Sequence, residues 1–247
     1  MPTREDLWPE PPATIDLAIG EVHLWAARLD PPEDLLRRCE NVLSADERDR
    51  AARFRAGPLR NHYIAGRGTL RMLLGRYLQA DPAGFLLTYQ AHGKPELGPP
   101  WNERGLEFNV SHSGSLALFA FTRVGPIGVD VEAIRAMPNA DALLQRFFSA
   151  EEVAQWRQTP AERQLAVFFQ GWTRKEAWLK AVGSGLSFPL NEFCVTLDGP
   201  ARVLSIHGDT AAAAAWWLES CEPCRGYVGA VALQGQVDAV RQWRFEG

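Results

Sequence analysis

Two short segments of the sequence carry charged residues in patterns that could do chemistry. Asp130 and Glu132 alternate with valines in one segment, and Glu176 and Lys180 lie among aromatic residues in another. Two carboxylates that stand close together raise each other's pKa unless a cation neutralises them. Oxygen-rich clusters suit the hard cation Mg²⁺, which keeps several waters and takes substrate phosphates as ligands. Together the two segments predict a divalent metal beside a phosphate group.

The first of these segments, residues 127–132, has the alternation of a β-strand. A strand sends successive side chains to opposite faces, so Val129 and Val131 share one face while Asp130 and Glu132 share the other. The same pattern also fits the solvated polar face of an edge strand, because any half-buried antiparallel strand alternates. Taken alone, the pair leaves both interpretations open.

The second segment is predicted to form a helix, with Lys180 one turn beyond Glu176. The alternative is an ion pair on the helix surface, since Glu and Lys four residues apart are common there. Aromatic residues indicate instead that much of this helix is buried or faces a partner. They are Phe168, Phe169, Trp172 and Trp178. A charge kept in such surroundings generally has a partner.

Three further groups of residues suit an anion. Lys94 lies in a Gly-Lys-Pro turn whose stiff exit fixes its direction. Ser111 and His112 end a predicted strand shortly before a glycine. A surface turn and a structural histidine are the competing interpretations. The densest basic series is typical of a solvated helix face but could also steer an acidic partner; it comprises Arg48, Arg50, Arg53, Arg55 and Arg60.

The composition limits the class of protein. The 247 residues are 46% hydrophobic and have a formal net charge of -4. A net acidic chain argues against wrapping nucleic acid, which needs a basic face. No apolar run approaches the roughly twenty residues of a membrane helix, and the N-terminus lacks the pattern of a secretory signal. We therefore expect a soluble, cytoplasmic protein that binds neither nucleic acid nor membrane.

The cysteines point to a reducing compartment. Four cysteines do not make a disulfide framework in a chain of this size. Cys221 and Cys224 have the spacing of a metal or redox pair, but the sequence offers no second pair or nearby histidine to complete a zinc site. Free thiols are the expectation.

The sequence contains an internal repeat. Ser44 and Ser149 each open a Ser-x-x-Glu capping box before an amphipathic helical stretch, and they lie 105 residues apart. At this offset the carboxylates of the second copy have no acidic counterpart in the first: Asp130, Glu132 and Glu176 correspond to Trp25, Ala27 and Arg71. A demand of the repeated fold would appear in both copies, so carboxylates in one copy favour a function; divergence of a surface is the alternative.

These elements predict an α+β fold of two similar lobes, related by an internal pseudo-twofold repeat, with the active site in the cleft between them. We expect a loosely ordered N-terminal extension over residues 1–14, a first lobe over residues 15–124 and a second lobe over residues 125–247 that carries the carboxylates. The expected strands are 22–27, 108–111, 116–122, 127–132, 193–197, 215–219 and 227–233.

Five motifs follow one another along the chain: Gly93-Lys94-Pro95, Phe108 to Ser113, Gly128 to Glu132, Arg146 to Ser149 and Trp172 to Lys180. Taken in this order, they closely resemble those of the 4'-phosphopantetheinyl transferases of the two-lobed, surfactin-synthetase-activating (Sfp) type. The Asp-x-Glu and Trp-x-x-Lys-Glu motifs at this separation are specific, and the other three support them. The resemblance covers roughly residues 44–197 and extends to the chain length and the repeat.

The resemblance implies a reaction. The enzyme would transfer the 4'-phosphopantetheine group of coenzyme A to a serine of an acyl, peptidyl or aryl carrier protein and release 3',5'-ADP. Asp130, Glu132 and Glu176 would hold Mg²⁺, with Mn²⁺ as the alternative. Glu176, directly or through a water, is the candidate base for the carrier serine. Lys180 would stabilise or protonate the departing phosphate, and His112 completes the candidate catalytic set.

The same resemblance implies contacts to coenzyme A from Arg53, Arg60, Lys94, Pro95, Ser111, His112, Lys175 and Lys180. One departure is Glu47, because the family often has a lysine near that position. We therefore expect Arg50, Arg53 or Arg60 to bind the 3'-phosphate of coenzyme A in its place. Carrier proteins of this class present an acidic helix, and we expect the segment Arg146-Phe147-Phe148 and the helix that follows to meet it. A monomer is the simplest assembly for two covalently joined lobes.

Two other functions fit part of the pattern. A different Mg²⁺-dependent phosphoryl or pyrophosphate hydrolase could use the same carboxylates. A catalytically silent coenzyme A-binding protein could keep the same pocket, although the presence of all three carboxylates and Lys180 argues against it. Carriers of polyketide, nonribosomal peptide and fatty acid synthesis fit the sequence equally.

Overall fold

The structure is a computed structural model that describes residues 8–55, 57–90, 93–183, 185 and 188–247. Its first half runs from one strand through three helices to four strands. In chain order these are β1 (Glu21–Arg28), α1 (Glu33–Asn41), α2 (Ala45–Arg53), α3 (Pro58–Leu78), β2 (Leu87–Tyr89), β3 (Pro95–Leu97), β4 (Glu107–Ser113) and β5 (Leu116–Thr122).

The second half repeats this order and adds a short helix and a final strand. Its elements are β6 (Ile127–Ala133), α4 (Ala140–Phe147), α5 (Ala150–Gln158), α6 (Ala161–Val182), β7 (Phe193–Val195), β8 (Val203–Ile206), α7 (Thr210–Ala214), β9 (Trp216–Cys221), β10 (Tyr227–Gln234) and β11 (Ala239–Arg244). The mixture of helices and strands confirms the predicted α+β class. Every strand expected from the sequence is present.

The two main sheets have the same strand order. The first contains β1, β5 and β4 as neighbours, and the second contains β6, β10 and β9, with every one of these pairs antiparallel. In each sheet the first strand of the half therefore pairs with the last strand of the repeated set. This recurrence supports the predicted duplication. A pseudo-twofold axis between the halves stays a prediction.

The last strand of the chain belongs to the first sheet. β11 pairs in parallel with β1, with Val22 opposite Val240. The side chains of Trp243 and Phe245 pack in the core of the first half. The predicted division of the chain assigned these residues to the second lobe, and the pairing with β1 moves them to the first sheet. The rest of that division stays a prediction.

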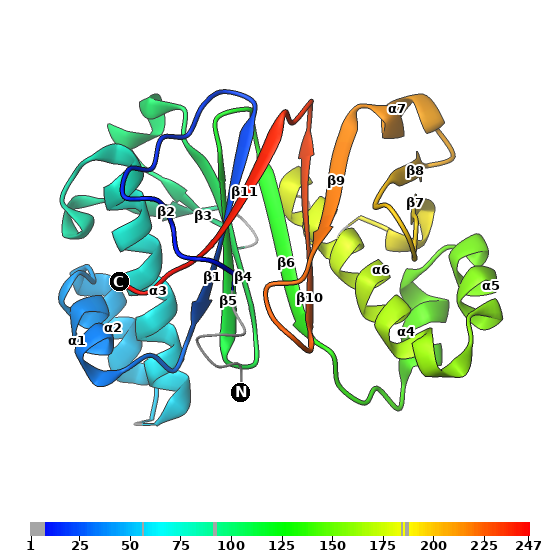
Figure 1. The fold of residues 1–247 in the computed structure, drawn as a ribbon, viewed down its shortest axis with the longest axis horizontal. Helices are drawn as coiled ribbons and strands as arrows, with labels where there is room; N and C mark the ends of the chain where they lie inside the picture. Colours follow the sequence, from blue (N-terminus) through cyan, green and yellow to red (C-terminus); the bar gives the residue numbers. More distant parts are fainter. Residues whose placement is uncertain (1–7, 56, 91–92, 184, 186–187) are drawn as a thin grey trace.

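The elements form four layers, helices, sheet, sheet and helices (Figure 1). One core lies between the first sheet and α1 to α3, and a second lies between the other sheet and α4 to α6. A third core fills the space between the two sheets, where Leu24 of β1 and Leu118 of β5 meet Val129 and Val131 of β6. The two valines therefore share one buried face, as their alternation predicted.

Each predicted capping box opens a helix and also anchors it. The carboxylates of Glu47 and Glu152 accept the main-chain N–H of Ser44 and Ser149. Both carboxylates are buried, and each pairs with a cation on the long helix of its half. Arg71 Nε on α3 lies 2.5 Å from Glu47, and Lys175 Nζ on α6 lies 2.8 Å from Glu152.

This correspondence corrects the register of the repeat in the long helices. Arg71 matches Lys175 by its contact, so the offset here is 104 residues instead of the 105 that relates the capping boxes. The counterpart of Glu176 is therefore Met72. Met72, like Arg71, carries no carboxylate, so the first half still has no counterpart of Glu176.

The N-terminal segment lies across both halves. Trp8 packs in the core between the sheets, and its Nε1 donates to the carbonyl of Glu222 at 2.8 Å. The main-chain N–H of Arg244 in β11 donates to the carbonyl of Pro9 at 2.9 Å. The loose extension predicted for residues 1–14 is therefore wrong for Trp8 and Pro9, and residues 1–7 lie outside the described part. Among the described residues, no helix combines the length and the apolar character needed to cross a membrane.

Candidate active site

The candidate site residues meet where the edges of the two sheets lie side by side. β4 is the last strand of the first sheet and β6 is the first of the second. Alternate residues of β4 reach β6 through side chains: Asn109 Oδ1 accepts a main-chain N–H of β6 at 2.9 Å. Ser111 Oγ donates to Asp130 Oδ1 and Ser113 Oγ donates to Glu132 Oε2, both at 2.7 Å. The polar positions of β4 therefore fix both carboxylates of β6.

Helix α6 lies directly on β6 because of a glycine. A Cβ added to Gly128 would come within 2.0 Å of the carbonyl oxygen of Ala177 and 2.3 Å of the main-chain nitrogen of Ala181. Any larger residue would push the helix off the strand. This close approach brings Glu176 and Lys180 of α6 to Asp130 and Glu132.

Lys180 is bonded to the strand on which Asp130 lies. Its Nζ lies 2.7 Å from Asp130 Oδ1, and it donates to Ser111 Oγ at 2.9 Å and to the carbonyl of Val129 at 3.2 Å. Burial raises the pKa of Asp130, and the ammonium of Lys180 opposes that rise. The second carboxylate oxygen of Asp130, Oδ2, is buried without a hydrogen-bond partner. A buried oxygen in this state is a place for a cation or a donor.

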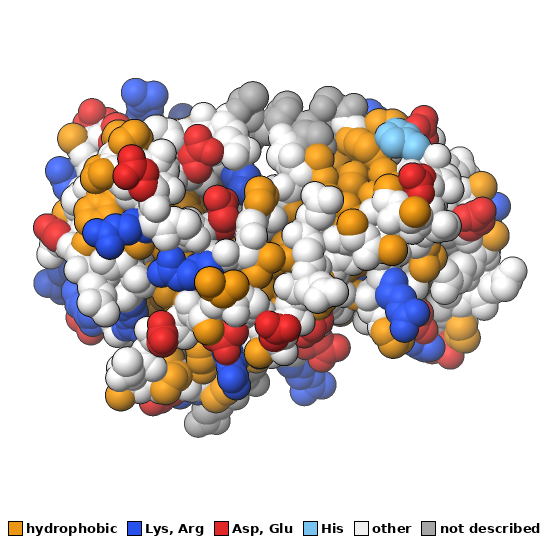
Figure 2. All heavy atoms as spheres, turned by 90° about the horizontal axis from the view of Figure 1, so that it is seen from above, with side chains coloured by type: hydrophobic (Ala, Val, Ile, Leu, Met, Phe, Trp, Pro, Cys, Tyr) orange, Lys and Arg blue, Asp and Glu red, His pale blue; other side chains and the backbone are white. Residues whose placement is uncertain are grey.

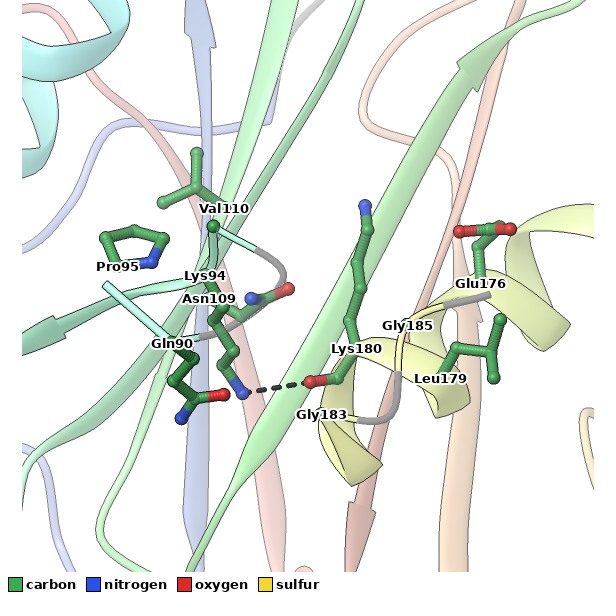
Figure 3. A pocket seen from close by; sticks show the side chains of 11 residues that line it. Gln90, Lys94, Pro95, Asn109, Val110, Glu176, Leu179, Lys180, Gly183 and Gly185 are labelled. Atoms are coloured by element: carbon green, nitrogen blue, oxygen red, sulfur yellow. Dashed lines mark hydrogen bonds between the residues drawn. The ribbon is translucent and has the colours of Figure 1, made fainter. Parts of the chain in front are cut away.

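Glu176 projects from α6 on the same side as Lys180 (Figure 3). Its pKa is raised to about 7, first by burial and then by the negative charge of Asp130, with Glu132 adding to the effect and Lys180 opposing it. Mutual repulsion of this kind shows that the three carboxylates share one electrostatic environment. Within the part of the chain that is described, no three acidic, histidine or cysteine side chains are close enough to enclose a metal ion by themselves.

Two hollows open beside these residues. The smaller, of about 480 Å³, is lined by Lys94, Pro95, Glu176 and Lys180 (Figure 3). The larger, of about 960 Å³, also reaches Pro95 and extends over the first half. Viewed from above, the molecular surface is hollowed between the two halves (Figure 2).

The larger hollow has a basic and aromatic wall. Arg50, Tyr63 and Arg67 line it, and the guanidinium of Arg50 lies 5.6 Å from the centre of the Tyr63 ring. Arg67 Nε lies 3.5 Å from Glu47 Oε1, whereas Arg67 Nη1 and Tyr63 Oη are buried without hydrogen-bond partners. His112 lies in the same hollow, and its pKa is lowered first by burial and then by Lys180. Unpartnered donors beside two arginines form a wall suited to an anion.

Both halves of the chain match models of a single superfamily. Residues 126–232 match the 4'-phosphopantetheinyl transferase superfamily, and residues 28–123 match the N-terminal domain of 4'-phosphopantetheinyl transferases. The 4'-phosphopantetheinyl transferase HetI of a Nostoc species is 39% identical over 96% of this chain and 98% of its own length. The chain belongs to the 4'-phosphopantetheinyl transferase family.

Other transferases of this family are similar over most of the chain. Psf-1 of Bacillus pumilus is 31% identical over 73% of this chain and 78% of its own. Sfp of Bacillus subtilis is 30% identical over 67% of this chain and 71% of its own. The predicted resemblance is therefore confirmed, and the protein is a transferase whose family uses coenzyme A, carrier proteins and a divalent metal.

Lys175 cannot make the coenzyme A contact predicted for it. Its side chain is fully buried on the other side of α6, where its ammonium pairs with Glu152 and donates to the carbonyls of Leu190 and Phe193. The preceding residue, Arg174, is also bonded within the second half, to Ser220 Oγ at 2.9 Å. Successive helix residues differ in direction by about 100°, so Lys175 and Glu176 face different surroundings.

The arginines predicted to hold a phosphate of coenzyme A lie in two places. Arg60 is paired with Glu40 at 2.6 Å. Arg53 lines a separate shallow hollow with Arg50. Glu47, which departs from the family pattern, is a buried capping residue bonded to Arg71 and does not enter either large hollow. The sequence patterns missed Arg67 and Tyr63, because both lie in an apolar helical stretch that resembles ordinary core.

The proposed carrier contact at Phe148 needs correction. Phe148 is 2% exposed and belongs to the core of the second half, so it cannot present a surface to a partner. Its neighbour Phe147 is partly buried, and the Arg146 guanidinium lies 4.9 Å from the centre of that ring. Arg146 and Phe147 remain the candidates of this segment.

Proposed function

We propose that this transferase uses Mg²⁺ to transfer the 4'-phosphopantetheine group of coenzyme A to a serine of an acyl or peptidyl carrier protein, releasing 3',5'-ADP. The observation that carries the proposal is the meeting of Asp130, Glu132, Glu176 and Lys180 at the junction of the two halves, between two hollows. The first half supplies the hydroxyls that hold the carboxylates, and the second half supplies the carboxylates themselves.

Mg²⁺ fits this set of residues. It takes oxygen ligands and commonly binds through one or two carboxylates, several waters and substrate phosphates, so a cage of three protein side chains is not required. The unpartnered Oδ2 of Asp130 supports Asp130 as a ligand, with Glu132 and Glu176 as the other candidates. The ion, or Mn²⁺ in its place, would neutralise charge on the pyrophosphate.

Glu176 is the candidate base for the carrier serine. In the reaction the serine Oγ forms a bond to the β-phosphorus of coenzyme A, the bond from that phosphorus to the oxygen of 3',5'-ADP breaks, and the serine proton must leave. A carboxylate whose pKa is raised to about 7 is matched to accept that proton near neutral pH. Lys180, one turn away, supplies positive charge for the departing phosphate.

The nucleotide end of coenzyme A belongs in the larger hollow. Arg50, Arg67 and His112 line that hollow, and they supply the positive and hydrogen-bonding groups that phosphates need. Arg67 replaces Arg60 in the proposed set, because Arg67 lines this hollow and Arg60 lines neither large hollow. The Nε of Arg67 lies 3.5 Å from Glu47 Oε1, which leaves its buried Nη1 for a ligand. Phosphoryl transfer depends mostly on such positioning and charge neutralisation.

The decisive experiment is mass spectrometry of carrier proteins incubated with the enzyme, coenzyme A and Mg²⁺. Addition of one phosphopantetheine group to the carrier supports the proposal, and a panel of carriers from polyketide, peptide and fatty acid synthesis would identify the partner. Release of phosphate without a change in carrier mass would favour a hydrolase. Tight binding of coenzyme A without any turnover would favour a binding protein.

The remaining expectations about partners belong to the same proposal. We propose a monomer that acts in the cytoplasm on carrier proteins and does not bind nucleic acid. Sedimentation of the purified protein measures whether it is a monomer. A carrier with an acidic recognition helix would be drawn to Arg146, so the charge reversal Arg146→Glu should raise KM for the carrier.

A further inference from the structure

Lys94 joins the two halves through its side chain. It follows the turn between β2 and β3 of the first half, and its Nζ donates to the carbonyls of Ile127 and Lys180, each at 2.9 Å. Ile127 is the first residue of β6, and Lys180 lies in the last turn of α6. Figure 3 shows the lysine reaching across from its hairpin to the end of the helix.

The carbonyl of Lys180 lies in the last turn of α6, whose carbonyls have no donor within the helix. α6 ends at Val182, and the main-chain N–H of Gly183 closes the helix on the carbonyl of Leu179. The last four carbonyls of a helix have no intrahelical donor, and a cation near them is also favoured by the helix dipole. Lys94 supplies both the donor and the positive charge at this end of α6.

The ammonium of Lys94 is partly buried. Burial lowers its pKa, and the carboxylates of Glu107 and Glu96 oppose that shift. Two of the three donors of an ammonium are therefore committed to main-chain carbonyls in a partly buried setting. Moving Lys94 onto a ligand would break both of its bonds to the Ile127 and Lys180 carbonyls.

The same turn of α6 carries the side chain that reaches Asp130. Lys94 holds the main chain of Lys180, while the side chain of Lys180 is bonded to Asp130 and Ser111. The chain has three lysines, and all three act on α6: Lys175 and Lys180 lie on it, and Lys94 caps its end. A shift of this cap would move Lys180 and, one turn earlier, Glu176.

We propose that Lys94 is a positioning residue that caps α6 and thereby aligns Lys180 and Glu176, and that it does not act by binding the phosphates of coenzyme A. The catalytic part of this inference rests on the proposed function. The capping part concerns the ligand-free protein and stands without it.

The test compares Lys94→Met, which keeps the stem but removes the donors, with Lys94→Arg, which keeps them. We expect Lys94→Met to lower kcat about 100-fold, the effect of a small misplacement of reacting groups, with Kd for coenzyme A changed less than twofold. Amide hydrogen exchange of residues 179–183 should become faster in the ligand-free variant. Lys94→Arg should restore the slow exchange and most of kcat.

Glu96→Gln is the matched control, because it removes a charge that faces the Lys94 ammonium but neither of the two carbonyls. Its exchange in residues 179–183 should equal that of the unmodified protein. A Kd for coenzyme A raised tenfold or more in Lys94→Met, with exchange unchanged, would overturn the proposal and make Lys94 a ligand contact.

A measurement on the unmodified protein gives an independent answer. Because the chain has three lysines, selective ¹⁵N labelling of lysine gives at most three side-chain signals. We expect the Lys94 signal to stay in place when coenzyme A is added, and a large shift of that signal would contradict us. Failure to modify any carrier would count against the proposed function alone, since hydrogen exchange in the ligand-free protein needs no carrier.

Discussion

Three consecutive residues of α6 show how closely the direction of a side chain decides its role. Arg174 and Lys175 are bonded inside the second half, whereas Glu176 enters the hollow at the junction. Neighbours in sequence suggested that Lys175 would share the function of Glu176, and the rotation of about 100° per residue separates them. The spacing of four residues was the reliable guide, because Lys180 does line the same hollow as Glu176.

Replacement of Asp130 tests the metal assignment. In Asp130→Asn the shape is kept but the negative charge is lost, so we expect transfer to fall at least about 1000-fold, in line with the loss of a charged group that acts in the transition state. Calorimetry should show weaker Mn²⁺ binding in the presence of coenzyme A, while circular dichroism shows an unchanged fold. Asp141→Asn, at an exposed position of α4, is the control. Full activity in Asp130→Asn would remove Asp130 from the site.

Glu176 should make the metal-free protein less stable as pH rises. Its pKa is about 7 in the folded protein and near 4.5 when unfolded, so the folded state binds the proton more tightly between these values. Stability from this group is therefore present at low pH and lost as pH rises through about 7. With a chelator present, Glu176→Gln should melt a few degrees above the unmodified protein at pH 8, and the difference should shrink toward pH 5. Equal melting temperatures at pH 8 would contradict the raised pKa.

At the scale of the elements, a buried ion pair recurs in both halves. Glu47 with Arg71 and Glu152 with Lys175 each tie the start of a short helix to the middle of a long one. The carboxylate of Glu152 also accepts the main-chain N–H of Val195 at 2.8 Å. These pairs fix the position of α3 and α6, so the helix that carries Glu176 is held at its middle by Glu152 and at its end by Lys94.

Removal of Lys175 from its ion pair with Glu152 should destabilise the fold and leave coenzyme A binding intact. Loss of the ammonium in Lys175→Met leaves the buried carboxylate of Glu152 without its cation. Such a loss typically lowers the free energy of unfolding by about 3–5 kcal/mol. Urea unfolding measures that loss. For the folded fraction of Lys175→Met, Kd for coenzyme A should change less than twofold. Lys180→Met, by contrast, should lower kcat or weaken the binding of coenzyme A directly. An unchanged free energy of unfolding together with weaker binding of coenzyme A would show that Lys175 does contact coenzyme A, as the sequence predicted.

The sequence was most informative where a pattern had a physical period. Alternation located β6, strand-like runs of residues located β4, β5 and β10, and the capping boxes located the starts of α2 and α5. β11 was missed because its residues are only partly buried at a sheet edge, and its partner β1 lies more than 200 residues away. The paired β4 hydroxyls could not be assigned to the carboxylates either, since no local pattern tells which strand edges meet.

At the scale of the whole molecule, the halves are interlocked. β11 completes the first sheet after the chain has built the second, Trp8 packs between the sheets, and the core between the sheets draws on both halves. The candidate active-site residues lie at this junction, so their arrangement exists only when both halves are folded and joined.

Interlocking predicts a single unfolding transition. Circular dichroism and tryptophan fluorescence should give coincident urea curves, because neither half can lose its sheet without exposing the shared core. Trp243→Ala should lower the stability of the whole protein by roughly 2 kcal/mol or more, since truncation of packed aromatic residues commonly costs at least this much. Two separated transitions would show that the halves fold independently.

Because the chain has few lysines, cleavage after lysine can report on the opening of α6. A protease that cuts only after lysine has two target bonds within α6, after Lys175 and after Lys180, and the side chains of both lysines are bonded in the folded protein. Cleavage under native conditions therefore measures how often this helix detaches, because proteolysis follows the population of the open form when opening is fast. Ligands that bind the closed site should slow the cutting in proportion to their affinity.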